Sequence, residues 1–224
     1  MSLKPQDICV LLKIVALEGT PWSYSQLAYE LGMSASEVHA GVKRAAEASL
    51  MRLEEGWGTP DPEALEELLV HGLKYVFAPV RGGLARGIPT SFAAPGLSAL
   101  LGLDTLLARA DEPPPVWPDD EGEVRGYEFS PLYKSVPFAA RRDAKLYELL
   151  ALVDAIRGGS TEEREAATRE LRARLRNQTH DARVLSLVPR RGMATGSRAA
   201  ATRIKRGSNG QEAQRVYRRR HRDS

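Results

Sequence analysis

Side chains with catalytic or metal-binding chemistry are few in this sequence, and their spacing assembles no catalytic set. Cys9 is the single cysteine, which excludes a disulfide framework, and the four histidines offer no zinc-ligand spacing. Ser91 and Ser130 lack the glycine context of a nucleophile elbow. The glycines that follow Arg81 and Arg86 match neither a P-loop nor a dinucleotide fingerprint. We therefore expect no enzyme, no metal site and no cofactor.

The other polar and aromatic candidates have structural interpretations. His71 lies in a leucine-rich stretch without a partner at suitable spacing, and we expect it to be partly buried and structural. The acidic run at residues 119–121 lacks the alternate spacing of a calcium loop. Four aromatic residues of the central region, residues 61–176, either pack its core or line a small-molecule effector pocket: Trp117, Tyr127, Phe129 and Tyr133.

Charge is divided unevenly along the 224 residues. Residues 1–180 carry 26 acidic and 20 basic side chains, whereas residues 181–224 carry 12 basic and 3 acidic ones. The overall net charge of +3 therefore belongs to the C-terminal segment. A segment this basic binds polyanions by counterion release, so it is either a DNA-binding arm or incidental to the fold and function. For the rest of the chain, nucleic-acid binding has to be argued from residue spacing.

No stretch of the chain predicts a membrane segment or an export signal. The most apolar stretch, Leu97 to Ala110, carries Asp104 and is shorter than the ~20 residues that span a bilayer. The first residues contain no basic region followed by an apolar run. With one cysteine and no such signal, we expect a cytoplasmic protein that makes no membrane contact.

The elements after residue 60 are predicted from caps and periodicity. Asp61 is a good N-cap for a helix from Pro62 to Lys74. Residues 78–134 hold eight prolines and seven glycines, which favour loops and short strands around one helical insert near residues 97–110. Alternation predicts a strand over Val124–Phe129, and residues 75–77 are a second candidate strand.

A pair of helices is predicted near the C-terminal end. Asp143 is the N-cap of the first, which Gly158 and Gly159 end. Ser160 and Glu163 form a capping box for the second, which runs to about Arg176. From Asn177 onward the composition is rich in Arg, Ala, Gly and Ser without periodicity, which predicts a disordered basic tail.

The first 57 residues predict three short helices. The first covers Pro5–Leu17 and is broken by Gly19-Thr-Pro21. Ser23 with Gln26 and Ser34 with Glu37 are capping boxes for the second and third, which continue to Gly32 and to about Ser49. Two capped helices separated by a glycine turn predict a helix-turn-helix.

Steric requirements inside this motif are met together. Ala28 is small enough for the two helices to approach closely, and Gly32 tolerates the left-handed backbone of the turn. Val38, with Leu27 and Leu31, is expected to close the small core between the helices. A three-helix bundle without a DNA partner would satisfy the same pattern.

The stretch LAYELGMSASEVHAGVKRAAEASL, residues 27–50, resembles the recognition unit of bacterial winged helix-turn-helix regulators, the MarR-like group most of all. The resemblance covers about residues 5–57. It implies that the third helix enters the major groove of double-stranded DNA and that a β-hairpin wing touches the backbone. It also implies that Leu50-Met-Arg-Leu is the first wing strand. The residues that it assigns to DNA are Ser34, Ser36, His39, Lys43 and Arg44 on the exposed side of the helix, with Arg52 near phosphate.

Several positions depart from that group's pattern. Ser49 stands where such proteins often have glycine. Glu54 and Glu55 would face phosphates in the wing, and residues 56–60 leave little room for a full second strand. Residues 1–60 carry five basic and seven acidic side chains, so binding would rest on a local patch and on a homodimer. His39 is either a base contact or an ordinary surface histidine.

Four stretches of the central region resemble a bacterial region found behind such winged helices, sometimes in regulators of toxin–antitoxin-like operons. They are residues 69–77, 86–95, 116–119 and 131–137. This resemblance assigns no chemistry, but it suggests a partner protein encoded nearby.

The sequence as a whole predicts a mainly α (α+β) protein in three parts. Residues 1–60 form the winged helix-turn-helix, residues 61–176 a Gly/Pro-rich region with short strands and the helix pair, and residues 177–224 the basic tail. The expected function is that of a DNA-binding transcriptional regulator, a repressor acting as a dimer. The alternative is an antitoxin-like interaction module that neutralises a partner enzyme, and the two functions are compatible.

Overall fold

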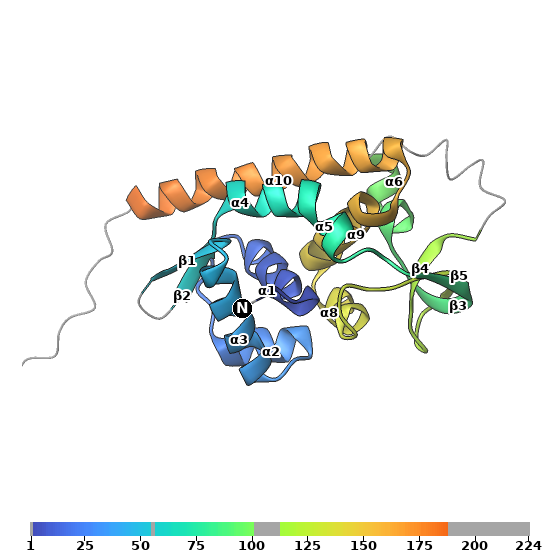
Figure 1. Cartoon of the computed structure of the whole chain (residues 1–224), viewed down its shortest axis with the longest axis horizontal. Coiled ribbons are helices and arrows are strands. Elements are labelled where there is room, and N and C mark those ends of the chain that lie inside the picture. Colours follow the sequence, from blue (N-terminus) through green and yellow to red (C-terminus); the bar gives the residue numbers. More distant parts are fainter. Residues whose placement is uncertain (1, 55–56, 101–112, 188–224) are drawn as a thin grey trace, which may run out of the picture. The chain divides into compact units, whose positions relative to one another are not determined.

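The computed structural model describes residues 2–54, 57–100 and 113–187, with the side chains at 54, 57 and 177–187 set aside. It is an α+β structure, mostly helical with small sheets, which confirms the predicted fold class at that level (Figure 1). The helices are α1 Pro5–Ala16, α2 Tyr24–Leu31, α3 Ala35–Glu47, α4 Pro62–Glu67, the π-helix η1 Leu68–Gly72, α5 Leu73–Val76, the 3₁₀-helix η2 Ser91–Ala93, α6 Leu97–Leu100, α8 Val136–Arg142, α9 Ala144–Gly158 and α10 Thr161–Leu187. The strands are β1 Met51–Glu54, β2 Trp57–Pro60, β3 Arg81–Pro89, β4 Pro115–Pro118 and β5 Val124–Phe129.

The caps of α2 and α3 are largely those that the sequence predicts. The Ser23 hydroxyl accepts from the Gln26 amide, but the Gln26 side chain donates to Glu30, so only half of that capping box forms. At α3 both halves form, because Ser34 accepts from Glu37 N and the Glu37 carboxylate accepts from Ser34 N. α3 ends at Glu47, two residues before its predicted end.

A hairpin follows α3 directly, as the wing prediction requires. β1 and β2 are antiparallel, with Arg52 opposite Thr59 and Leu53 opposite Gly58. The Trp22 indole donates to the Gly58 carbonyl at 3.1 Å, which ties the hairpin to the segment before α2. The second strand therefore forms in the few residues available, and both strands are four residues long.

The helical stretch from Pro62 to Val76 contains a π-helical turn that the sequence did not predict. Leu65, Leu69 and Leu73 recur every four residues and are all fully buried. A π-helical turn such as η1 holds more residues than an α-helical turn. It therefore keeps leucines that are four residues apart on one face, whereas in a regular α-helix they would drift gradually around the axis. Two predictions are wrong here: the residues proposed as a strand at 75–77 include the end of α5, and His71 is exposed.

Three short strands make a small closed sheet in the central region. β3 pairs antiparallel with both β4 and β5, while β4 and β5 pair in parallel. A Cβ at Gly87 would lie 2.1 Å from the Trp117 carbonyl oxygen, so this close pairing of β3 with β4 needs glycine. β5 confirms the predicted strand. Of the helical insert predicted near residues 97–110, α6 is present and residues 101–112 lie outside the described part.

The two C-terminal helices begin as predicted. Asp143 caps α9 by accepting from the Lys145 and Leu146 amides, and Ser160 and Glu163 form the reciprocal box before α10. α10 continues to Leu187, eleven residues past its expected end at about Arg176. Residues 188–224 of the predicted tail lie outside the described part.

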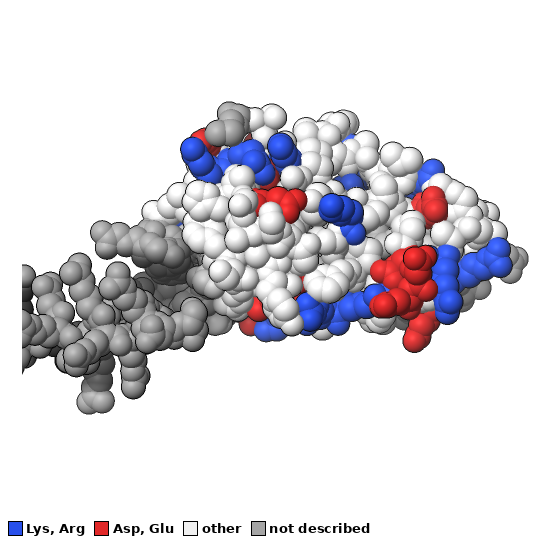
Figure 2. Space-filling view, turned by 90° about the horizontal axis from the view of Figure 1, so that it is seen from below, with Lys and Arg blue, Asp and Glu red and all other residues white. Residues whose placement is uncertain are grey.

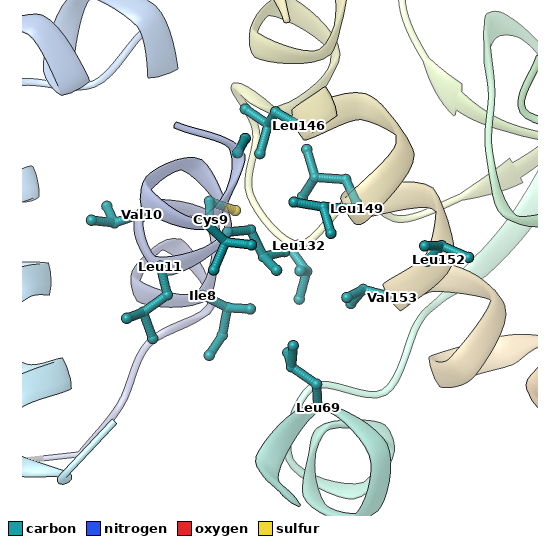
Figure 3. Close-up of a cluster of buried hydrophobic side chains, with 14 of the residues drawn as sticks. Ile8, Cys9, Val10, Leu11, Leu69, Leu132, Leu146, Leu149, Leu152 and Val153 are labelled. Atoms are coloured by element: carbon teal, nitrogen blue, oxygen red, sulfur yellow. The ribbon is translucent and has the colours of Figure 1, made fainter. Parts of the chain in front are cut away.

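The buried apolar side chains form one cluster that crosses the predicted boundary at residue 60. Figure 3 shows Ile8 and Cys9 of α1 on the side toward Leu149 and Val153 of α9, with Leu69 of η1 completing the cluster. These five side chains are all at most 3% exposed. Helix α1 and the region after residue 60 therefore share a core. In the described residues no helix combines the length and apolar character needed to cross a membrane.

Candidate nucleic-acid interface

The α2–α3 unit has the internal geometry predicted for a helix-turn-helix. Gly32 ends α2 with φ of +62°, in the left-handed region that favours glycine. Ala28 is buried, and so are Val38, Leu27 and Leu31. These steric predictions are confirmed, so the turn and the small core define the direction of α3.

The outer face of α3 carries the polar residues assigned to it except Arg44, which is buried. Ser34, Ser36, His39 and Lys43 are exposed. The Ser34 hydroxyl also hydrogen-bonds Glu37 as part of the cap, so it is committed to the helix start. The His39 ring lies 5.1 Å from that of Tyr24. Within the described part of the chain, Lys43 makes no ion pair, which leaves its charge available to a ligand.

Arg44 does not lie on the exposed face, contrary to the sequence prediction. Its guanidinium is buried and forms a two-pronged ion pair with Asp7 of α1, at 2.7 Å from Nε to Oδ2 and 2.6 Å from Nη2 to Oδ1. The hydrogen bonds to Asp7 raise the pKa of Arg44 above its ordinary value. A side chain held this way ties α3 to α1 and is removed from the set of candidate DNA contacts.

Arg52 projects from the hairpin. Its side chain is 79% exposed and pairs with Asp61, the N-cap of α4, at 2.7 Å. The hydrogen bond from Arg52 holds the pKa of the Asp61 carboxyl below its ordinary value. Because such exposed pairs contribute little stability, a phosphate can replace the carboxylate at small cost.

The central region contacts the first turn of α3, an arrangement that the sequence did not predict. The Tyr133 hydroxyl donates to Glu37 Oε1 at 2.6 Å. This bond, with those from Ser34, lowers the pKa of Glu37 to about 2. Phe138 of α8 lies against the turn, since a Cβ at Gly32 would be 2.8 Å from its ring. Nothing in local spacing indicates these contacts, because Glu37 and Tyr133 are 96 residues apart.

A second link between the first helices and the central region runs through Lys13, which is buried. Its ammonium lies 2.5 Å from Glu30 of α2 and 2.6 Å from Asp143, the N-cap of α9. These two carboxylates raise the pKa of Lys13 against the opposing effect of its burial. One cation thus joins three helices and fixes α2 relative to the central region.

Charge on this side of the molecule is sparse. Figure 2 shows a largely uncharged surface with Lys and Arg side chains at several separate places, and a cluster of acidic side chains, flanked by basic ones, toward the end that carries the β3–β5 sheet. Asp119 and Glu121, from the turn between β4 and β5, pair with Arg141. The candidate interface is therefore local to α3 and the hairpin and is no broad basic surface.

The buried polar centre of the central region is fully engaged in structural bonds. The Asp154 carboxylate accepts from Thr90, Trp117 and Arg157, and Arg157 also donates to the carbonyls of Phe77 and Ser130. Burial raises the pKa of the Asp154 carboxyl, and these donors oppose that effect. With every group bonded, this centre joins segments of the fold and presents no free reactive group.

The four aromatic residues expected to pack the core or to line a pocket differ in their burial. Trp117 and Phe129 are buried, Tyr127 is 43% exposed and Tyr133 packs partly against the core. Among the described residues, no cluster of histidine, cysteine, aspartate or glutamate could hold a metal ion. The Cys9 thiol is buried, and burial raises its pKa to about 12.

Comparison of the chain with models of protein families, with curated proteins and with solved structures found no match in any of the three.

Proposed function

We propose that this protein is a DNA-binding transcriptional regulator of the winged helix-turn-helix type, a repressor that acts as a dimer. The observation that carries the proposal is the two-sided character of α3. Its inner face is buried through Val38, Val42 and Ala45, while its outer face presents Ser36, His39 and Lys43. A polar helix face beside a turn and a hairpin is what insertion into a groove requires.

The outer face matches the dimensions and donor pattern of the major groove. A 13-residue helix is ~20 Å long, and the groove of B-DNA, ~12 Å wide, admits a helix. Lys43 can donate to guanine O6 and N7, and Ser36 and His39 can donate to or accept from base edges. Arg52 on the hairpin would take a backbone phosphate, as in the predicted wing.

Internal ion pairs leave few cations of the N-terminal segment available to DNA. Residues 1–60 contain five basic side chains, of which Arg44 and Lys13 are consumed by Asp7 and Glu30. The exposed cations are Lys4, Lys43 and Arg52. Three cations support weak binding, so two copies on adjacent half-sites, ~34 Å apart, would be needed for a useful affinity.

Selection of duplexes from a randomised pool by the purified full chain tests the proposal. We expect enrichment of a sequence with two-fold symmetry and half-sites about one helical turn apart, since operator symmetry mirrors that of the protein dimer. A pool that stays random after repeated rounds at ~150 mM salt would contradict sequence-specific binding, because non-specific attraction to phosphate enriches no sequence.

A second candidate is a protein-interaction module of the antitoxin type. It is favoured by three large apolar side chains that are more than half exposed within six residues of the central region, Tyr75, Val76 and Val80. Exposed apolar patches mark partner surfaces more often than scattered single residues do. Co-expression with the product of the adjacent gene would test this function. A stable complex that is lost in the double variant Tyr75→Ser, Val76→Ser supports it. Recovery of the chain as a monodisperse protein without the co-expressed product contradicts it.

A further inference from the structure

Arg142 occupies a defined place beside the α2–α3 turn. It is the last residue of α8, and its guanidinium carbon lies 4.6 Å from the ring centroids of both Tyr29 and Phe138. It also donates to the Tyr29 hydroxyl at 3.0 Å. An arginine that contacts two rings in this way has already lost much of its rotamer freedom.

The charge of Arg142 is uncompensated, unlike that of its neighbours. Arg141 pairs with Asp119 and Glu121, and Lys145 pairs with Glu18. No carboxylate of the described residues lies within ion-pair distance of Arg142. The segment therefore presents one fixed and exposed cation between two that are already neutralised.

The place of this cation is set by contacts to α2, the turn and the first turn of α3. Phe138, one of the two stacking rings, also touches Gly32, and Tyr133 from the same segment bonds Glu37. Tyr29, the other ring, belongs to the last turn of α2 and is 69% exposed. Arg142 thus lies at the edge of the helix-turn-helix, on the side where α3 begins.

We propose that Arg142 binds a DNA phosphate that flanks the groove entered by α3, extending the interface onto the central region. The inference rests on the proposed DNA-binding function. A guanidinium recognises phosphate through two parallel N–H donors. A guanidinium that is already held in position loses less conformational entropy when it binds. Helix-turn-helix proteins need backbone contacts beside the recognition helix to fix its register, and Arg142 supplies one where the exposed cations of α3 are few.

A purely structural role for Arg142, stapling α8 to α2, makes a different prediction. Loss of a staple lowers the melting temperature and loosens α3, so it lowers the preference for the selected sequence. Loss of a phosphate contact weakens binding to every sequence equally and reduces the salt dependence of binding.

The experiment compares full-length Arg142→Gln, Arg142→Lys and the adjacent control Arg141→Gln. The probes are a 24-base-pair duplex recovered from the randomised pool and a scrambled duplex of equal composition, titrated at several salt concentrations. For Arg142→Gln we expect about tenfold weaker binding to both probes, the effect of one charge-assisted hydrogen bond. Its salt slope should fall by about 0.9, the value for one phosphate. Arg142→Lys should keep the slope, and Arg141→Gln should match the parent.

Three results would overturn the phosphate contact. They are an unchanged slope in Arg142→Gln, an equal loss in Arg141→Gln, or a loss confined to the selected duplex, which is the signature of the structural role. The scrambled duplex reports on Arg142 whether or not α3 reads sequence. A failure of the proposed function appears separately, as an equal affinity of the parent for both probes.

Discussion

Arg44 of α3 and Asp7 of α1 form a buried two-pronged ion pair across 37 residues of sequence. Asp7 is fully buried and also accepts from the Lys4 amide at 2.8 Å, so it caps the start of α1 while it neutralises Arg44. The pair fixes the packing of the candidate recognition helix on α1. It also determines which of two adjacent cations, Lys43 or Arg44, remains available to DNA.

Removing either partner of this pair should strongly lower the free energy of unfolding. Arg44→Ala leaves a buried carboxylate without its partner, a change that costs ~3–5 kcal/mol. Chemical denaturation should show this loss, while the adjacent exposed variant Lys43→Ala should stay within ~0.5 kcal/mol of the parent. Equal stability of the two variants would contradict the buried pair.

Gly32→Ala should destabilise the turn between α2 and α3 for two separable reasons. A left-handed backbone costs an L-residue ~1–2 kcal/mol, and the new Cβ would lie 2.8 Å from the Phe138 ring. In a Phe138→Ala background the second cost disappears, so the substitution should be milder there. Thermal unfolding of the four proteins of this cycle measures both costs, and strictly additive effects would contradict the contact between Gly32 and Phe138.

Ser49→Gly should stabilise the protein. Ser49 follows α3 with φ of +60°, and Leu50 N bonds the Ala45 carbonyl at 2.9 Å, as in a glycine-ended helix. Relief of the left-handed strain, ~1–2 kcal/mol, exceeds the extra unfolded-state entropy of glycine, ~0.4–1 kcal/mol. The expected net gain is ~0.5–1 kcal/mol in denaturation, with Ala48→Gly as a destabilising control. A loss of stability in Ser49→Gly would count against this backbone conformation.

The Tyr133–Glu37 bond should make the contact between α3 and the central region sensitive to acid. Tyr133 and Ser34 lower the pKa of Glu37 to about 2 from its ordinary value of 4.5. The ionised carboxylate therefore stabilises the fold above pH ~4.5, and this contribution is lost as the pH falls from there toward 2. The stability difference between parent and Tyr133→Phe should shrink over that window. A difference independent of pH between 2 and 6 would show that Glu37 is not its partner.

Local signals in the sequence predicted α2, α3 and the turn between them well, because each signal depends on neighbours a few residues away. Ser34 with Glu37, the turn at Gly32 and the burial of Val38 all follow from capping, backbone freedom and helical period. The same reasoning found the caps at Asp143 and Ser160, since an N-cap acts within one turn.

The wrong or missing predictions concern residues whose positions depend on partners far away in the sequence. Helical period places Arg44 at the border of the exposed face, and only the presence of Asp7 on α1 draws it inward. The contact of Tyr133 with Glu37, and that of Phe138 with Gly32, depend on how α8 packs against α2. The π-helical turn at residues 68–72 is likewise set by the core that Leu65, Leu69 and Leu73 have to reach.

The most direct test of the proposed function is the ratio of affinities for the selected and scrambled duplexes, measured for the full chain and for a triple variant of the outer face of α3. The variant Ser36→Ala, His39→Ala, Lys43→Ala removes exposed side chains and leaves the buried pair of Arg44 intact. Non-specific attraction by the basic C-terminal segment acts on both duplexes and cancels in the ratio. Since each base contact is worth ~1–3 kcal/mol, we expect the ratio to fall at least ~tenfold, with Arg141→Gln matching the parent. An unchanged ratio in the folded triple variant would contradict recognition of DNA by α3.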